Sequence, residues 1–398
     1  MARRILGLVL SLLACILSLL GWNGMIQVDH AHYETVDRAL INPDADEGAK
    51  ALYQYLLESY GKRVISGQYI NEYEDFSAPQ FRVDESDPNS PSTVFKANEL
   101  RAVYSVTGAY PAMLGLDLSE IETGRECYSI QQAIEWHKAG GIVTLCWHWM
   151  APTQTEGKRH FYTEKTDFNL KQALENPGSA EYQGLLHDID LICAELQKLQ
   201  EAGVPILWRP LHEASGGWFW WGASGPKAYQ SLWSLMYDRM TNVHGLNNLI
   251  WVYNGQDPKW YVGDERCDII GDDPYYTNGS RVAYYFDSAN ANRFKTCYKT
   301  SQNKMIAMTE NDFLPNLNRM FQKNTKWLTF CTWCREFVCV MDESAGWGVT
   351  TPEYSGKYAS ADELRTVYQD ERVVTLERLN GSGGYGYCLL YTSDAADD

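Results

Sequence analysis

Near its middle the sequence reads Pro205-Ile206-Leu207-Trp208-Arg209, and this apolar run passes directly into the polar stretch Arg209-Pro210-Leu211-His212-Glu213. A short run that is apolar throughout is typical of a strand buried on both faces. Similar runs recur along the chain, at residues 64–67, 112–116, 142–147, 249–253, 268–271, 305–309 and 327–331. Together they predict eight buried strands.

Segments with helical spacing separate several of these strands. One of them has apolar residues at intervals of three and four: Leu185, Ile189, Ile192, Leu196 and Leu199. Residues 224–240 show a similar pattern. Alternating buried strands and helices predict an α/β fold, a (β/α)8 TIM barrel forming a single catalytic domain. An open doubly wound sheet is the alternative, and we disfavour it because no glycine-rich phosphate-binding motif follows an early strand.

The two ends of the chain differ from the region between them. A short basic start precedes an apolar run, which predicts that residues 1–25 are a signal peptide and that the protein is secreted. Because Leu12-Leu13-Ala14-Cys15 resembles a lipoprotein cleavage box, a lipid anchor at the cell surface through Cys15 is the alternative. Residues 30–380 are expected to form the catalytic domain, and residues 381–398 a disordered tail of non-native appearance.

The amino-acid composition restricts the kinds of molecule that the protein is expected to bind. The 398 residues carry a formal net charge of −17, which repels phosphate backbones, so we expect no nucleic-acid partner. The chain is rich in Trp and Tyr, which pack in cores or stack on sugar rings. The ten cysteines could include disulfides. The pair Cys331-Thr-Trp-Cys334 lacks the second pair of ligands that a zinc site needs, so we expect no metal. We also expect that the protein needs no cofactor and that it is a monomer.

Two carboxyl groups at strand ends predict the chemistry. Glu213 follows the fourth strand and precedes the aromatic run Trp218-Phe-Trp-Trp221, and an apolar wall raises the pKa of a carboxyl group so that it can donate a proton. Glu310 follows the seventh strand. Glycoside hydrolysis needs two such groups, and a separation of about 5–5.5 Å makes the enzyme a retaining one. A zinc-protease motif is excluded because position 216 is glycine.

The chain resembles glycoside hydrolase family 26, whose best-known members are endo-β-1,4-mannanases. The resemblance runs from about residue 65 to residue 379. It is carried by these segments: Arg209-Pro-Leu-His-Glu213, Trp218-Phe-Trp-Trp-Gly222, Gly140-Gly-Ile-Val-Thr-Leu-Cys-Trp-His-Trp149, Asp268-Ile-Ile-Gly-Asp-Asp-Pro-Tyr275, Thr309-Glu310 and Thr332-Trp-Cys-Arg-Glu-Phe337. It implies a retaining endo-β-1,4-mannanase acting on mannan, galactomannan or glucomannan. Alternatives are β-1,3-xylan or mixed-linkage β-glucan as substrate, or exo-action as a mannobiohydrolase.

The resemblance also implies roles for individual residues. Glu213 is the acid/base and Glu310 the nucleophile. His212 is expected to hydrogen-bond near the nucleophile and orient it, and Tyr275 to hold the nucleophile through its hydroxyl group. The remaining substrate-binding residues are two polar side chains, His148 and Arg209, and two sugar-stacking rings, Trp218 and Trp333.

The sequence departs from the family pattern at two places. Many relatives read Ser-Glu-Phe-Gly at the nucleophile, whereas this chain reads Thr309-Glu310-Asn311-Asp312-Phe313. Asp272 and Asp273 stand before Tyr275, and we align Asp273 with the family pattern. Asn254 and Asp117 also end strands, but the sequence assigns them no role.

Overall fold

The computed structural model describes residues 26–71, 93–119, 121–124, 128–152, 159–276, 288–346 and 348–385. The predicted signal segment with Cys15, and residues 386–398 of the predicted tail, lie outside the described residues. Tyr385 is buried, and its hydroxyl lies 2.8 Å from Nδ1 of His137. The folded part therefore extends past the domain boundary predicted at residue 380.

Eight parallel strands form the centre of the molecule, one from each predicted run. They are β1 (Val64–Tyr69), β2 (Met113–Asp117), β3 (Ile142–Cys146), β4 (Ile206–Arg209), β5 (Leu249–Tyr253), β6 (Ile269–Asp272), β7 (Met305–Met308) and β8 (Thr329–Thr332). Neighbours pair in sequence order from β1 to β7, and β8 pairs back with β1. The prediction of a (β/α)8 barrel is confirmed.

The barrel closes between β7 and β8 through few main-chain contacts. The Leu328 N–H donates to the Ile306 carbonyl at 2.9 Å, and the Asn311 N–H donates to the Cys331 carbonyl at 3.1 Å. The Trp333 N–H donates to the Asn311 carbonyl at 3.1 Å, which completes an isolated parallel bridge between Asn311 and Thr332. Side chains add bonds across the same gap, among them the Thr329 hydroxyl to the Met308 carbonyl at 2.8 Å. By contrast, β6 and β7 pair in register along four successive residues.

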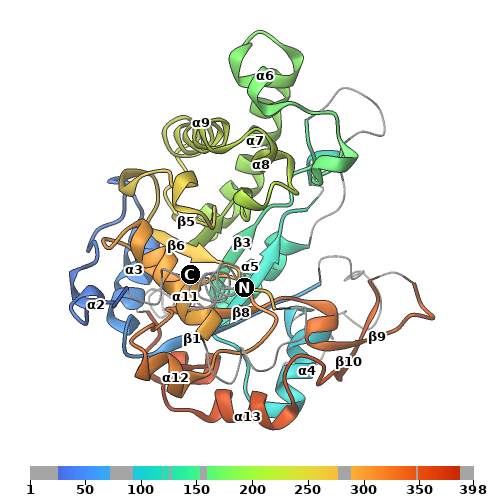
Figure 1. The fold of residues 1–398 in the computed structure, drawn as a ribbon. Coiled ribbons are helices and arrows are strands. Elements are labelled where there is room, and N and C mark those ends of the chain that lie inside the picture. Colours follow the sequence, from blue (N-terminus) through green and yellow to red (C-terminus); the bar gives the residue numbers. More distant parts are fainter. Residues whose placement is uncertain are drawn as a thin grey trace, which may run out of the picture.

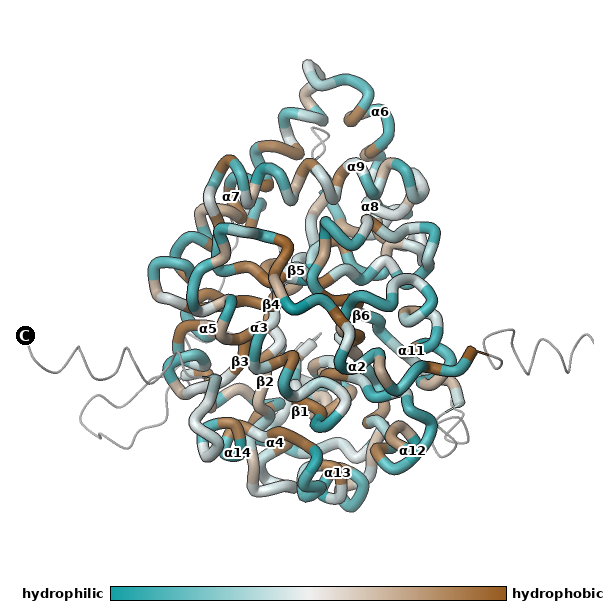
Figure 2. Tube along the Cα trace, turned by 90° about the vertical axis from the view of Figure 1, so that its left-hand side faces the viewer, coloured by the Kyte–Doolittle hydropathy of each residue, from teal (hydrophilic) through white to brown (hydrophobic). Residues whose placement is uncertain are grey.

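Helices surround the strands (Figure 1). They are α2 (His32–Thr35), α3 (Glu47–Ser59), α4 (Asn98–Thr107), α5 (Ser129–Lys138), α6 (Leu170–Glu175), α7 (Ala180–Glu201), α8 (Trp220–Ala223), α9 (Pro226–Tyr237), α11 (Ser288–Thr300), α12 (Leu317–Gln322), α13 (Ala361–Gln369) and α14 (Leu376–Gly381). Shorter helical turns link them: η3 (Thr93–Lys96), η4 (Ile121–Thr123), η5 (Thr163–Lys165), η6 (Ala214–Gly216), η8 (Pro258–Trp260), η9 (Asp264–Arg266) and η10 (Arg335–Phe337). In Figure 2 apolar segments gather at the strands, and hydrophilic ones lie mostly on the outer helices.

Both predicted helices are present. All five apolar residues of the first lie on the buried face of α7, whose N-terminus is capped by the Ser179 hydroxyl accepting from the Tyr182 N–H. The second is α9, which continues as a π-helix, η7 (Asp238–Val243). Within the described ranges, no helix is both long and apolar enough to span a membrane.

Three short strands were not predicted. β9 (Cys339–Met341) and β10 (Thr350–Tyr354) form an antiparallel pair, and β11 (Val373–Val374) pairs with the first two residues of β1. β10 has no apolar run and β11 is only two residues long, so the pattern that identified the barrel strands did not identify them. β9 lies in the apolar run of residues 337–341, which was not predicted to be a strand.

Candidate active site

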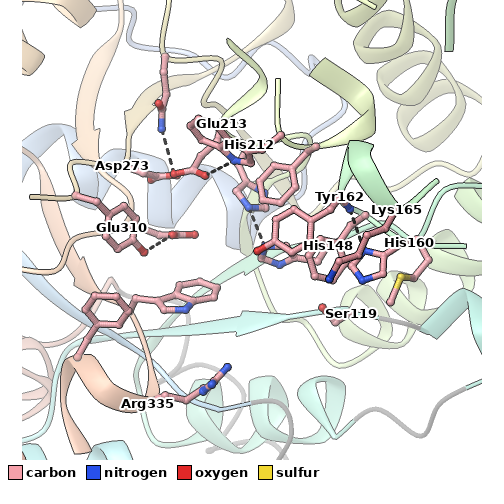
Figure 3. A pocket seen from close by; sticks show the side chains of 18 of the residues that line it. Ser119, His148, His160, Tyr162, Lys165, His212, Glu213, Asp273, Glu310 and Arg335 are labelled. Carbon is pink, nitrogen blue, oxygen red and sulfur yellow. Dashed lines mark hydrogen bonds between the residues drawn. The ribbon is translucent and has the colours of Figure 1, made fainter. Parts of the chain in front are cut away.

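The polar ends of the barrel strands meet in a cleft of about 770 Å³ (Figure 3). Most of the predicted site residues line it: His148, His212, Glu213, Trp218, Tyr275, Glu310 and Trp333. The remaining one, Arg209, is fully buried and contacts two carboxylates of the cleft. The fold therefore gathers all eight predicted site residues in one place.

Glu213 stands in a turn with a left-handed backbone, at φ 54°. Its N–H donates to the Asn254 carbonyl at 2.7 Å, which ties the turn after β4 to the end of β5. Its carboxylate accepts from Trp218 Nε1 at 3.0 Å and from Gln256 Nε2 at 3.4 Å. Gly216 permits this arrangement, since a Cβ there would lie 2.0 Å from the Trp218 ring. The glycines after Glu213 thus allow the indole to bond to the carboxylate.

Glu310 follows β7 and is held by two donors. The Tyr275 hydroxyl donates to it at 2.6 Å, and Arg209 Nη2 donates to its other oxygen. Arg209 Nη1 donates to Asp273 at 2.8 Å, and Asp273 in turn accepts from the Thr309 hydroxyl at 2.6 Å. One buried guanidinium therefore contacts two buried carboxylates, and the Tyr275 hydroxyl contacts one of them.

The two glutamates differ in what surrounds their charge. Burial, and after it the negative charges of Asp273 and Glu310, raises the pKa of Glu213 to about 8. Burial also raises the pKa of Glu310, to about 7, but Arg209 and the Tyr275 hydroxyl act in the opposite direction. Of the pair, Glu310 therefore ionises first and Glu213 retains its proton longer.

The two carboxyl groups also lie close together. Oxygens of Glu213, Asp273 and Glu310 all lie within 4.8 Å of one another. Retaining glycosidases hold their two carboxyl groups about 5–5.5 Å apart, whereas inverting enzymes need about 6.5–9.5 Å to admit a water molecule between them. The spacing matches the retaining arrangement.

His212 contacts a different partner from the one expected. Its Nε2 lies 3.3 Å from Nε2 of His148, whose Nδ1 bonds to the buried carboxylate of Asp117. Among the described residues, Glu310 is instead oriented by Arg209 and Tyr275. The expectation that His212 bonds near Glu310 and orients it is thus corrected.

Aromatic rings form the walls of the cleft. Trp333 packs against Tyr69 at a centroid distance of 4.6 Å, and part of its ring faces the cleft. Trp218 is 44% exposed, so one face of it remains open next to Glu213. On the same side, Tyr162 stacks on Phe219 with an interplanar angle of 19°. Exposed ring faces beside a carboxyl pair suit sugar rings, whose C–H faces are apolar.

Some residues that build the site were not predicted as site residues. Asp273 and Tyr69 both contact Arg209, and Gln256 contacts Glu213. Asn254 and Asp117, to which the sequence assigned no role, support Glu213 and His148. Their positions in the sequence could have identified them, since each of these five residues lies at or shortly after the end of a strand.

Comparison with known proteins agrees with this geometry. The model of the family described as "Glycosyl hydrolase family 26" matches residues 41–342. The chain belongs to glycosyl hydrolase family 26.

Relatives of this family 26 chain have names that agree with one another. It is 36% identical over 358 residues to a mannan endo-1,4-β-mannosidase of Thermothelomyces thermophilus, an alignment that covers 87% of this chain and 64% of the relative. It is 29% identical to the enzyme of the same name from Bacillus subtilis, over 77% of this chain and 84% of the relative. The chain spans from about half to two thirds of the first curated relatives it matches.

Solved structures named as β-mannanases share the fold. A β-(1,4)-mannanase of Podospora anserina superposes with a TM-score of 0.71 at 33% identity, covering 87% of this chain and 70% of that one. A β-mannanase from a symbiotic protist of the termite Reticulitermes speratus, complexed with gluco-manno-oligosaccharide, gives 0.68 at 29% identity, covering 86% and 98%.

Proposed function

We propose that this protein is a retaining endo-β-1,4-mannanase with Glu310 as nucleophile and Glu213 as acid/base. The observation that carries the proposal is the close carboxyl pair, in which Glu310 bonds to a guanidinium and a phenol while Glu213 faces negative charge. Membership in a family whose compared relatives are named as β-mannanases supports the substrate.

The geometry supports double displacement. A Glu310 oxygen attacks the anomeric carbon as the bond to the leaving sugar breaks, and the proton of Glu213 moves to the leaving oxygen. Glu310 then carries the sugar and no longer a charge, so one cause of the raised pKa of Glu213 disappears. Glu213 can now accept a proton from water, whose oxygen attacks the anomeric carbon and releases Glu310.

The remaining cleft residues bind and orient the sugar. In this proposal Trp333 and Trp218 supply stacking surfaces, and His148 and His212 supply polar contacts at the base of the cleft. Arg209 acts through the two carboxylates that it holds. The substrate is a β-mannan polymer outside the cell, which agrees with the predicted signal segment and with action as a secreted monomer.

Substituting the two glutamates tests the assignment. Glu213→Ala and Glu310→Ala should each lower the rate of mannan hydrolysis by orders of magnitude, while Glu181→Ala, at an exposed site on α7, serves as the matched control. A dinitrophenyl β-mannobioside needs no proton on its leaving group, so it should restore formation of the intermediate in Glu213→Ala only. Undiminished mannan hydrolysis in either variant would contradict the assignment. Assaying mannan, β-1,3-xylan and mixed-linkage β-glucan side by side tests the substrate.

A further inference from the structure

At the base of the cleft, ring nitrogens of two histidines lie at a distance typical of two ligands of one metal ion. Nε2 of His148 lies 3.3 Å from Nε2 of His212, and the rings are inclined by 80° (Figure 3). Two histidine nitrogens bound to one tetrahedral zinc ion, at about 2.0–2.1 Å each, lie about 3.3 Å apart. A modest rotation of the rings would direct both lone pairs at one ion.

The support behind His148 also resembles that of a metal ligand. Its Nδ1 bonds to the Asp117 carboxylate, and its main-chain N–H donates to the other Asp117 oxygen at 3.1 Å. Since an ionised carboxylate only accepts, Nδ1 carries the proton of this bond, and in the neutral ring Nε2 is the nitrogen left to bind an ion. Histidines that bind metals usually donate their other N–H to a carboxylate in this way.

Carboxyl groups lie in the same cleft as the two histidines. Glu213, Asp273 and Glu310 crowd the cleft near the histidines, and Arg209 is the guanidinium that contacts two of them.

We propose that His148 and His212 form an inhibitory site for a divalent transition-metal ion such as Zn²⁺, with Asp117 supporting His148 from behind. Both Nε2 atoms bind the ion, and water fills the remaining positions. His212 then carries its proton on Nδ1, which has no hydrogen-bond partner among the described residues. This buried N–H weakens the site, so we expect micromolar rather than nanomolar affinity.

The location predicts what the ion does. Both rings line the same cleft as Glu213 and Glu310, so a hydrated ion there occupies space that a sugar needs. The inhibition rests on the proposed function, but the binding does not. No metal was expected from the sequence, and the proposed site departs from that expectation.

Calorimetric titration with ZnCl₂ at pH 7 tests the binding without an activity assay. The wild type should bind one equivalent, and His148→Gln and His212→Gln should each weaken binding about tenfold or more. His187→Gln, on the exposed side of α7, is the matched control and should bind as the wild type does. Near-ultraviolet circular dichroism confirms that each variant is folded, and visible absorption with CoCl₂ reports the coordination.

A second set of ligands lies nearby and must be distinguished. Ligand atoms of Asp117, Cys146 and His148 also lie within 4.8 Å of one another. Cys146→Ser should leave zinc binding unchanged, and loss of binding in this variant would overturn the His148–His212 site. Absence of binding in the wild type, or undiminished binding in both histidine variants, would overturn it as well.

Inhibition is measured separately. ZnCl₂ should raise the KM for mannan without lowering kcat, and EDTA should restore the original KM. Zinc binding in a protein that hydrolyses no mannan would contradict the proposed function and leave the metal site standing.

Discussion

Arg209 is the cation that offsets the negative charges of the buried carboxylates in the site. It is fully buried, and its two terminal nitrogens contact Glu310, Asp273 and the Tyr69 hydroxyl. Despite burial, contact with Asp273 and then with Tyr69 and Glu310 holds the pKa of Arg209 well above its ordinary value. Removing one partner from a buried ionic group is far more damaging than its net contribution suggests, because the other charges remain buried.

Arg209→Met should therefore lower the free energy of unfolding by about 3–5 kcal/mol and abolish activity. Arg209→Lys keeps the charge but cannot form the forked contacts, so it should lose less stability and still most of its activity. Urea denaturation followed by Trp fluorescence measures the first effect. Equal stability of Arg209→Met and the wild type would show that the two carboxylates do not depend on this guanidinium.

The two glutamates predict how activity depends on pH. The rate requires Glu310 ionised and Glu213 protonated, so it should rise as pH passes through about 7 and fall as pH passes through about 8. Because the Trp218 N–H bond lowers the pKa of Glu213, Trp218→Phe should move the alkaline limb to higher pH. The measurement is kcat/KM across pH 5–10, and an alkaline limb that survives in Glu213→Gln would contradict the assignment of the acid.

At the scale of the element, the segment after β3 is anchored by buried carboxylates. Glu122 accepts from Trp147 Nε1 at 3.2 Å and from the Met150 N–H at 2.5 Å, and Asp188 on α7 accepts from Trp149 Nε1 at 2.9 Å. His148 lies between the two anchored tryptophans. The outer helix α7 thus helps to position a cleft residue through a side chain, Asp188, that does not itself line the cleft.

Asp188→Leu should lower the free energy of unfolding by about 1–3 kcal/mol, since the Trp149 N–H loses its buried acceptor. Trp147 and Trp149 stack at a centroid distance of 4.2 Å, so their near-ultraviolet circular dichroism should change as well. Asp188→Asn keeps an acceptor and should show a smaller effect in both measurements. If kcat of Asp188→Leu is lower than that of the wild type when the same fraction of each protein is folded, His148 has been displaced.

The barrel strands were predictable because each contains an apolar run bounded by polar residues. The sequence Thr350-Thr-Pro-Glu-Tyr354 has no such run, so β10 could not be found in this way. The candidate site was predictable as a set of polar residues at strand ends. Its pairing was not, because the contact of His212 with His148 rather than Glu310 depends on ring directions that no spacing along the chain encodes.

At the scale of the whole molecule, buried carboxyl groups determine how stability depends on pH. Burial raises the pKa of Glu122 to about 7, and those of Asp268, Asp272 and Asp312 to about 6. Each group binds its proton more tightly folded than unfolded, so its stabilising contribution is present below its unfolded pKa and is lost as pH rises through its folded pKa.

Stability should therefore be greatest at mildly acidic pH and decline between about pH 4 and pH 7. The net charge of −17 at pH 7 acts in the same direction through self-repulsion. Thermal melts from pH 4 to pH 8 measure the trend, with Asp268→Asn as the variant that should flatten it. A melting temperature that rises between pH 4 and pH 7 would show that buried histidines dominate instead, since burial lowers the pKa of His32 and of His137 to about 4 and their stabilising contribution is lost as pH falls.

The strands β7 and β8 share few main-chain hydrogen bonds, so the barrel can open between them more easily than elsewhere. β7 leads to Glu310 and β8 to Trp333, so the two sides of this seam carry the nucleophile and a wall of the cleft. A brief separation there would disable the cleft while neighbours such as β2 and β3, which pair along five successive residues, stay together. On warming, turnover would then cease reversibly below the melting temperature, and deuterium would enter the amides of Asn311 and Leu328 ahead of those in β2 and β3.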